Sequence, residues 1–251
     1  MSNNIRVLVA CMPKSGSTYL SGAIEALPGV IRAHLVPGYG RREQELCIEK
    51  LTDCEAMISN HGFGYVAQHH VRYSEVSKLY FEQFGVRPVV LVRNIFDVVA
   101  SLIDHHSLES SIYPAAYAPA DIACRSFDAQ ARFITQMAIP WYFNFYASWQ
   151  SCEDKIIVTY EDFILTPELV LTKVCSYLGF NASNEMIVDA VLVAGAAGLR
   201  KNKIVSGRGK LLPLDCVSAI KKMASHYKDI DFSAIGIYPD DLIVGESLEG
   251  V

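Results

Sequence analysis

The sequence predicts an α/β fold of three layers, in which a central parallel β-sheet is flanked by helices. Two observations support this prediction. Continuous apolar runs at 5–11 and 87–92 are typical of parallel strands, which are buried on both faces. Segments with helical periodicity alternate with such runs, and this order is typical of a helix-covered parallel sheet. Because the 251 residues contain no linker, low-complexity block or internal repeat, we expect one domain spanning 1–251.

The strands and helices are expected in the following order. "IRVLVAC" (5–11) forms the first strand, and "TYLSGAIEAL" (18–27) forms a helix that closes at the "PG" after it. A strand at 63–71 and a helix at 74–85 with a terminal glycine come next, before the clearest buried strand, "RPVVLV" (87–92).

The second half of the chain continues this alternation. Residues 94–106 form a helix with Asn94 as N-cap and Asp97 three residues later, which is close to a capping box. Residues 154–163 are expected to form a strand that leaves acidic residues at its end, and 167–179 form the helix after it, with Pro167 near its start and Gly179 at its close.

Composition limits the class of function. A net charge of -5 argues against broad electrostatic binding to nucleic acid or anionic membranes. The seven cysteines show neither CxxC pairing nor metal-ligand spacing, which favours reduced thiols over a disulfide framework. The first residues show no basic region before a long apolar stretch, and their apolar run is too short to span a membrane, so we expect a cytoplasmic protein.

The turn "PKSGST" (13–18) follows the first strand directly. A tight turn from a buried strand into a helix directs backbone N–H groups and the positive end of the helix dipole at one point, where an anion can bind. Gly16 permits close approach of the backbone, the hydroxyl side chains add donors, and Lys14 adds a charge. The alternative is a solvated turn in which a serine caps the helix. Since the lysine precedes the glycine, the turn lacks the Walker A pattern GxxxxGK[ST], which weakens a kinase interpretation.

"PKSGSTY" resembles the 5′-phosphosulfate loop, PKSGTTW, of the sulfotransferases that use 3′-phosphoadenosine 5′-phosphosulfate (PAPS). "VVLVRNIFDVVASL" resembles the 3′-phosphate motif of that family, and "VSGRGK" (205–210) resembles its C-terminal glycine- and arginine-rich loop. The resemblance implies a P-loop NTPase-like sulfotransferase fold, with PAPS as co-substrate and 3′-phosphoadenosine 5′-phosphate (PAP) as product. It also implies a set of nucleotide-binding residues: Lys14, Ser15, Gly16, Ser17, Thr18, Tyr19, Arg93, Ser101, Tyr160, Arg208 and Gly209.

Within this set, each group has an expected role. Arg93 leaves the sheet edge near the first loop and can hold a phosphate through its fork of donors, although an arginine that ends a strand is often only a salt-bridge partner. Ser101, on the next helix, can add a hydroxyl from the same face. Tyr19, which replaces the usual tryptophan, could stack on the adenine, and Tyr160 of "YED" could help hold it.

The resemblance also implies the chemistry. A histidine that ends the strand before the 3′-phosphate motif often deprotonates the acceptor, and "YVAQHHV" places His70 at that position. His69 remains a rival, since neighbouring strand residues point to opposite faces, and a purely structural pair is a third alternative. Lys14 would stabilise charge on the departing phosphate. No metal is needed; we expect "DHH" (104–106) to be a solvated helix end and not a ligand set.

The acceptor is not visible in the sequence beyond its class, a small-molecule, glycan or lipid hydroxyl, with an amine less favoured. The aromatic stretch 140–149 has helical i,i+4 spacing, which favours core over an acceptor pocket, and the turn-prone segment 34–45 could be an acceptor-side loop. Ile95 and Phe96 stand where many relatives have "PK", and no dimerisation stretch is evident, so the oligomeric state stays open. A magnesium-dependent kinase and a non-catalytic nucleotide-binding module are the alternatives.

Overall fold

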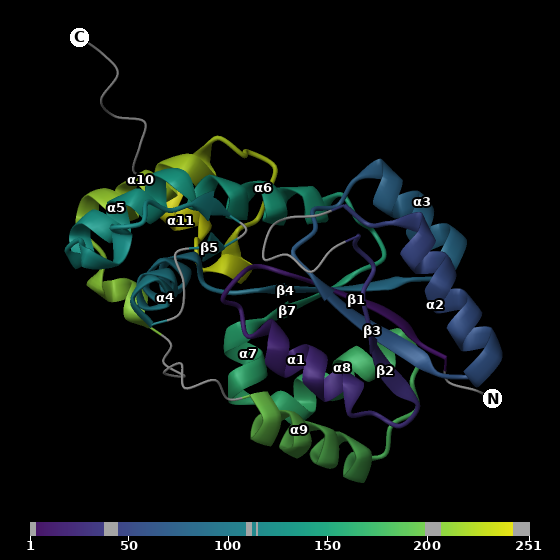
Figure 1. The fold of residues 1–251 in the computed structure, drawn as a ribbon. Helices are drawn as coiled ribbons and strands as arrows, with labels where there is room; N and C mark the ends of the chain where they lie inside the picture. The colour runs from purple at the N-terminus through teal and green to yellow at the C-terminus, as the bar shows by residue number, and fades with distance from the viewer. Residues whose placement is uncertain (1–3, 38–44, 109–111, 114, 199–206, 243–251) are drawn as a thin grey trace.

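The computed structural model of the chain describes residues 4–37, 45–108, 112–113, 115–198 and 207–242. Its centre is a five-stranded sheet in the order β2-β3-β1-β4-β7, in which all neighbouring strands run parallel (Figure 1). The strands are β1 (Arg6–Cys11), β2 (Val30–Ala33), β3 (Gly64–His69), β4 (Arg87–Val92) and β7 (Ile156–Thr159). The predicted α/β class with a central parallel sheet is therefore confirmed.

Helices cover both faces of the sheet (Figure 1). Side chains of β1 alternate between two hydrophobic clusters, with Val7 and Val9 in one and Leu8 and Ala10 in the other. The first cluster is closed by α1 (Ser17–Glu25), α7 (Tyr160–Leu165), α8 (Pro167–Leu178) and α9 (Asn184–Gly198). The second is closed by α2 (Ile48–His61), α3 (Glu75–Phe84), α4 (Ile95–Leu108), α5 (Phe127–Met137), α6 (Ile139–Gln150) and α10 (Leu214–Ser225).

Short elements complete the described chain. β5 (Ile112–Tyr113) and β6 (Ala116–Tyr117) form an antiparallel pair. Three 3₁₀ turns cover Ile122–Cys124, Arg208–Leu211 and Ser233–Ile235, and α11 covers Pro239–Leu242. The turn Arg208–Leu211 packs against α4, which brings a late segment of the chain to the helix that follows β4.

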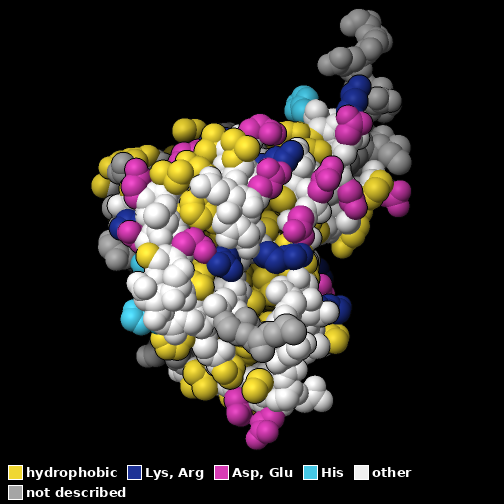
Figure 2. Space-filling model, turned by 90° about the vertical axis from the view of Figure 1, so that its right-hand side faces the viewer, with side chains coloured by type: hydrophobic (Ala, Val, Ile, Leu, Met, Phe, Trp, Pro, Cys, Tyr) yellow, Lys and Arg dark blue, Asp and Glu magenta, His cyan; other side chains and the backbone are white. Residues whose placement is uncertain are grey.

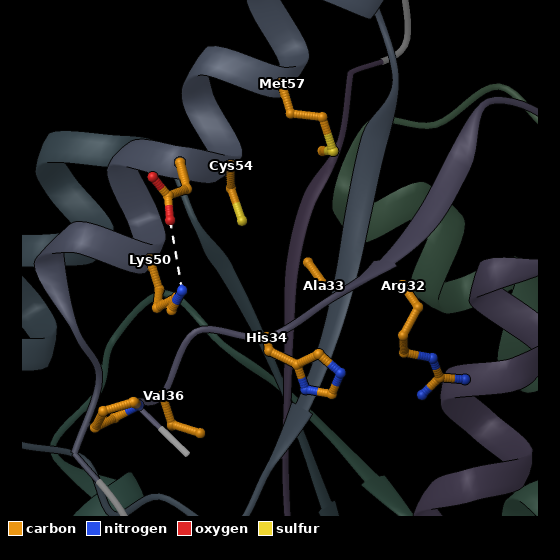
Figure 3. Close-up of a pocket in the computed structure, with 9 residues that line it drawn as sticks. Arg32, Ala33, His34, Val36, Lys50, Cys54 and Met57 are labelled. Carbon is orange, nitrogen blue, oxygen red and sulfur yellow. Dashed lines mark ion pairs between the residues drawn. The ribbon is translucent and has the colours of Figure 1, made fainter. Parts of the chain in front are cut away.

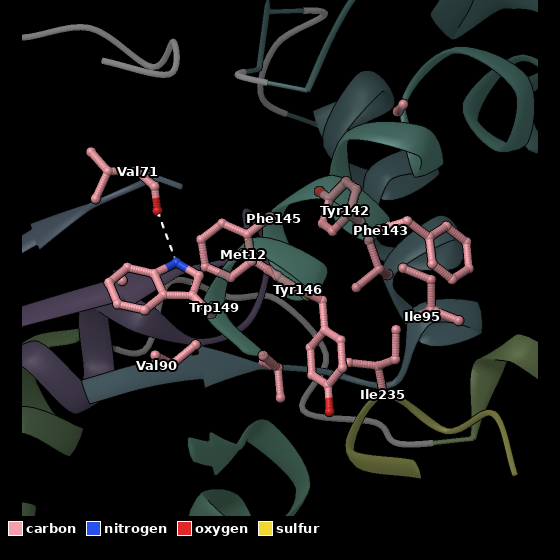
Figure 4. Packing of buried hydrophobic residues seen from close by; sticks show 14 of the residues in the cluster. Met12, Val71, Val90, Ile95, Tyr142, Phe143, Phe145, Tyr146, Trp149 and Ile235 are labelled. Carbon is pink, nitrogen blue, oxygen red and sulfur yellow. Dashed lines mark hydrogen bonds between the residues drawn. The ribbon is translucent and has the colours of Figure 1, made fainter. Parts of the chain in front are cut away.

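The aromatic helix α6 lies in the core, as its spacing predicts. Tyr142, Phe145 and Trp149 are fully buried, and the Trp149 Nε1–H donates to the Val71 carbonyl oxygen at 3.1 Å (Figure 4). The buried indole N–H therefore has a hydrogen-bond partner. The i,i+4 aromatic stripe fixes α6 against the end of β3 in place of forming an open pocket.

Two local expectations are confirmed only in part. The strand expected over 154–163 ends at Thr159, because the Thr159 Oγ1 accepts the backbone N–H of Asp162 at 3.1 Å and starts α7. The capping box expected at α4 is half present: Asn94 Oδ1 accepts the N–H groups of Phe96 and Asp97, but the Asn94 N–H donates to Glu161 instead of to Asp97.

The two connections that leave β1 and β4 cover opposite faces of the sheet. The chain runs from β1 into α1 on one face and from β4 into α4 on the other. Adjacent parallel strands whose connections part in this way leave a crevice at their carboxyl ends, where such folds bind ligands. The loops at 12–16 and 93–94 lie at this crevice.

One face of the molecule carries charged side chains of both signs. Figure 2 shows Asp and Glu side chains interspersed with Lys and Arg over one face. In the part of the chain that the structure describes, no helix is long and apolar enough to cross a membrane. The cysteines at 11, 47, 54, 124, 152, 175 and 216 are all free thiols.

Candidate active site

The loop between β1 and α1 is held by one of its own side chains and by side chains from two other segments. Ser15 Oγ donates to the Met12 carbonyl at 2.6 Å, the Tyr142 hydroxyl donates to the Pro13 carbonyl at 3.2 Å, and Arg93 Nη1 donates to the Lys14 carbonyl at 2.9 Å. In a planar trans peptide the N–H points opposite to the C=O. The N–H groups of Lys14 and Ser15 therefore point away from Tyr142 and Arg93, as an anion-binding loop requires.

Two backbone conformations in this loop are unusual. Gly16 has φ +79°, and a Cβ at this position would lie 2.8 Å from Cδ2 of Tyr160, so both torsion and space require glycine. Lys14 has φ +66° and is the one non-glycine residue with a positive φ in the described chain. Such strain concentrates at functional sites, because the surrounding contacts must maintain it.

The first turn of α1 begins at Ser17 with Gly16 as N-cap and without a side-chain cap. Its N–H groups and the positive end of the dipole lie beside the loop. Ser17 is buried and its Oγ accepts from Gln68 Nε2 at 2.8 Å, whereas Thr18 is exposed. Of the two hydroxyls, Thr18 is thus the one that reaches solvent.

Arg93 joins the two motif loops. It is 6% exposed, its guanidinium lies 4.1 Å over the centre of the Tyr160 ring, and its bond to the Lys14 carbonyl spans 79 residues of sequence. Tyr160 is the first residue of α7 and is packed against Gly16 on one side and Arg93 on another. The ring therefore supports the loop and the arginine.

Ser101 and the glycine-rich turn meet on α4. Ser101 is buried, and Asp97 and Asp104 lie one turn before and after it on the same helical face. Arg208 forms a bidentate ion pair with Asp104, in which Nη1 donates to Oδ2 and Nη2 donates to Oδ1. Gly209, the other residue predicted in this turn, also packs on α4; residues 205–206 of the motif lie outside the described residues.

The histidines of "QHH" make different hydrogen bonds. The Leu35 N–H donates to His69 Nε2 at 2.9 Å, and burial, together with the neighbouring imidazoles of His34 and His70, lowers the pKa of His69 to about 3. The His70 Nδ1 lies 2.8 Å from the Cys11 carbonyl oxygen, and burial lowers the pKa of His70 as well. Because a carbonyl oxygen only accepts, Nδ1 of His70 carries the hydrogen and Nε2 keeps its lone pair.

A pocket of about 340 Å³ lies at the carboxyl end of β2. The ring of His34, which lines the pocket, lies 6.0 Å from the ring of His69. Figure 3 shows Cys54 and Met57 of α2 facing the end of β2. The remaining lining residues are Arg32, Ala33, Val36, Pro37, Lys50 and Asp53. A mixed lining of apolar and charged side chains is typical of a site for a small organic molecule.

Two more expectations require comment. Tyr19 of α1 is half-buried, with its ring 4.7 Å from Phe163 and its hydroxyl near Gly195. It therefore packs against α7 and α9. "DHH" is not a solvated helix end: Asp104 is ion-paired, and His105 and His106 are 6% and 5% exposed. Among the described residues, no group of three or more His, Cys, Asp or Glu side chains could hold a metal ion.

The sequence did not single out four of the side chains that hold this site: Gln68, Tyr142, Glu161 and Asp104 as an arginine partner. Their partners are between 47 and 129 residues away along the chain. No local pattern marks such pairings. The one available signal was the excess of polar groups at the carboxyl ends of the strands.

Comparison with known proteins agrees with this geometry. A family model described as the sulfotransferase domain matches residues 4–206. The structure of mouse sulfotransferase SULT7A1 complexed with PAP is similar, with a TM-score of 0.62, 13% identity and coverage of 92% of this chain and 86% of that one. No curated protein sequence matched significantly.

Two further structures share the fold. Retinol dehydratase in a complex with retinol and PAP has a TM-score of 0.55 and 13% identity, covering 90% of this chain and 82% of its own. A sulfotransferase from Alicyclobacillus acidocaldarius has a TM-score of 0.50 and 11% identity, covering 92% and 94%. At these identities the likeness establishes the common fold.

Proposed function

Because the chain belongs to the sulfotransferase family, we propose that it transfers the sulfuryl group of PAPS to a hydroxyl acceptor by in-line displacement and releases PAP. The observation that carries this proposal is the bond from Arg93 to the Lys14 carbonyl, which joins the two predicted phosphate-binding loops at one crevice. We further propose that residues 1–251 act as a single domain, since the proposed site residues come from one sheet and its flanking helices.

The 5′-phosphosulfate is assigned to the loop at 12–18, where the N–H groups of the loop, Thr18 and the Lys14 ammonium supply donors. The 3′-phosphate is assigned to Arg93, Ser101 and the turn at Arg208 and Gly209. PAP complexes of two proteins of the same fold support this choice of nucleotide. Tyr19 and Tyr160 remain proposed neighbours of the adenine, with Tyr160 acting mainly through Arg93.

His70 is the proposed general base. Its Nε2 accepts the hydroxyl proton of the acceptor as the acceptor oxygen bonds to sulfur and the bond from sulfur to the PAP phosphate oxygen breaks. The Lys14 ammonium stabilises the charge that develops on that leaving oxygen. Hydrogen bonding supports His70 over His69, because the accepting nitrogen of His69 is already taken by the Leu35 N–H.

The pocket lined by His34 is the proposed acceptor side. Its volume of about 340 Å³ suits a compact acceptor, and Met57 and Cys54 offer an apolar surface beside the charged rim. Retinol and androsterone, which occur in complexes of a protein of this fold, are alcohols with large apolar bodies. We therefore propose an amphipathic small-molecule alcohol over a glycan chain.

The proposal is tested by calorimetric titration with PAP, AMP and ATP without metal, followed by PAPS-dependent transfer to a panel of phenols and primary alcohols. We expect PAP to bind most tightly, Arg93→Ala to weaken it by tenfold or more, and Lys14→Ala to lower turnover by about 100-fold or more. Tighter binding of magnesium ATP would establish a kinase instead. Tight PAP binding without turnover of any acceptor would favour a non-catalytic nucleotide-binding module.

A further inference from the structure

The turn Gly207–Lys210 is docked on α4 by two carboxylates. Asp97, which is 3% exposed, accepts the Gly207 N–H through Oδ2 at 2.7 Å and the Gly209 N–H through Oδ1 at 2.6 Å. A Cβ on Gly209 would lie 2.3 Å from the Phe96 Cβ, so only glycine permits this approach. The backbone of the turn is therefore held on α4 independently of the Arg208 side chain.

Asp104 holds the arginine of the turn in the same way. Both terminal nitrogens of the Arg208 guanidinium donate to the Asp104 carboxylate, and the two side chains are 20% and 34% exposed. A bidentate pair sets both the position and the plane of a guanidinium, which a single contact cannot do. The partly buried setting limits competition from water, so this pair is held more firmly than most surface ion pairs.

The pair leaves donors for a second anion. A guanidinium has five N–H groups in a rigid fork, and the contact with Asp104 uses one on each terminal nitrogen. The Nε–H and one N–H on each terminal nitrogen are not used by Asp104. Asp97, Ser101 and Asp104 follow each other at spacings of four and three residues, so they form one stripe on α4 with the Ser101 hydroxyl between the carboxylates.

We propose that Asp104 is a positioning residue for the 3′-phosphate: it orients Arg208 so that the unused N–H groups are ready for a phosphate bound near Ser101. This inference rests on the proposed function. An unrestrained arginine loses most of its rotamer freedom when it binds phosphate, whereas Arg208 has already lost it to Asp104. Asp104 does not contact the nucleotide in this scheme and acts only through Arg208.

The alternative is that Asp104 weakens phosphate binding instead of strengthening it. A carboxylate near a phosphate repels it, and if Asp104 occupied the same N–H groups as the phosphate, it would be a competitor. Asp104 contacts only the two terminal nitrogens of Arg208, which leaves the Nε edge of the guanidinium unused by Asp104. This geometry argues against competition. Positioning and competition predict opposite changes when the charge of Asp104 is removed.

The experiment compares PAP with AMP, which differ only in the 3′-phosphate, by calorimetry on the wild type and Asp104→Asn. We expect PAP binding to weaken by about tenfold and AMP binding to stay unchanged, since the ordering of one arginine is lost. Arg208→Lys should cause a similar loss, and the double variant should bind PAP no worse than Arg208→Lys alone. Asp215→Asn is the matched control, because Arg132 and Asp215 form a bidentate pair elsewhere; it should change neither affinity.

Three results would overturn the inference. Unchanged or tighter PAP binding by Asp104→Asn would mean that Asp104 is neutral or competes. Equal weakening of PAP and AMP would mean that the variant disturbs the whole site. If the wild type itself did not prefer PAP to AMP, the proposed function would fail together with this inference, a result distinct from the other two.

Discussion

Gly16 lies where backbone torsion and steric space both exclude a side chain, so Gly16→Ala should incur both penalties. An alanine at φ +79° pays the left-handed penalty of about 1–2 kcal/mol. Its Cβ would also lie 2.8 Å from the Tyr160 ring, and overpacking against a rigid neighbour costs about 1–3 kcal/mol more. We therefore expect the free energy of unfolding to fall by about 2–5 kcal/mol.

Gly29→Ala is the matched control. Gly29 has φ +77°, but a Cβ there would meet nothing within 4 Å, so only the torsional penalty of about 1–2 kcal/mol applies. Urea unfolding with linear extrapolation measures both free energies, and calorimetry measures PAP affinity. Only Gly16→Ala should weaken PAP binding, because displacing Tyr160 moves the Arg93 guanidinium stacked on it. Equal stability losses and unchanged PAP affinity in both variants would refute the steric argument.

Two further predictions concern protons. Burial lowers the pKa of His70, so the acid limb of the kcat/KM profile should be centred below pH 6.5. His70→Asn should lose at least about 100-fold in rate together with this acid limb. A limb centred above pH 6.5 would exclude His70 as the base. The pKa of His69 is about 3 in the folded state and about 6.5 in the unfolded state. Between these pH values the unfolded state binds more protons, so the free energy of unfolding falls as the pH falls. Between pH 6.5 and 5 the wild type should lose about 2 kcal/mol more of its unfolding free energy than His69→Gln, whose amide can still accept from Leu35; equal losses in urea titrations would contradict this.

The central strands were predictable because their signal is local. Every residue of "VLVAC" in β1 is 0% exposed, and such a run of apolar residues can only be placed inside a sheet covered on both faces. β2 gave no such signal, since it is a four-residue edge strand in which Arg32 pairs with Glu25. The end of β7 was recognisable in hindsight: Thr159 and Asp162 have the spacing of an N-cap and the residue whose N–H it accepts.

The sequence predicted the charged groups of the proposed site, but it did not predict their hydrogen-bond partners. Motif spacing indicated Lys14, Arg93 and Arg208, yet it carried no information on Tyr142 or Asp104, which hold the loop and Arg208 from 129 and 104 residues away. The proposal of His70 over His69 as the base also rests on hydrogen bonds that the sequence does not show. Alternation along a strand says that the two point apart, whereas only the acceptor and donor at each ring fix which nitrogen can take a proton.

The order of the strands explains why one loop can serve both halves of the proposed reaction. β1 lies between β3 and β4, so the loop after it is flanked on one side by His70, which follows β3, and on the other by Arg93, which follows β4. The Cys11 carbonyl orients His70 and the Lys14 carbonyl receives Arg93. A change in the backbone between Cys11 and Gly16 should therefore disturb the base and the phosphate anchor together, whereas substitutions on α4 should affect nucleotide binding alone.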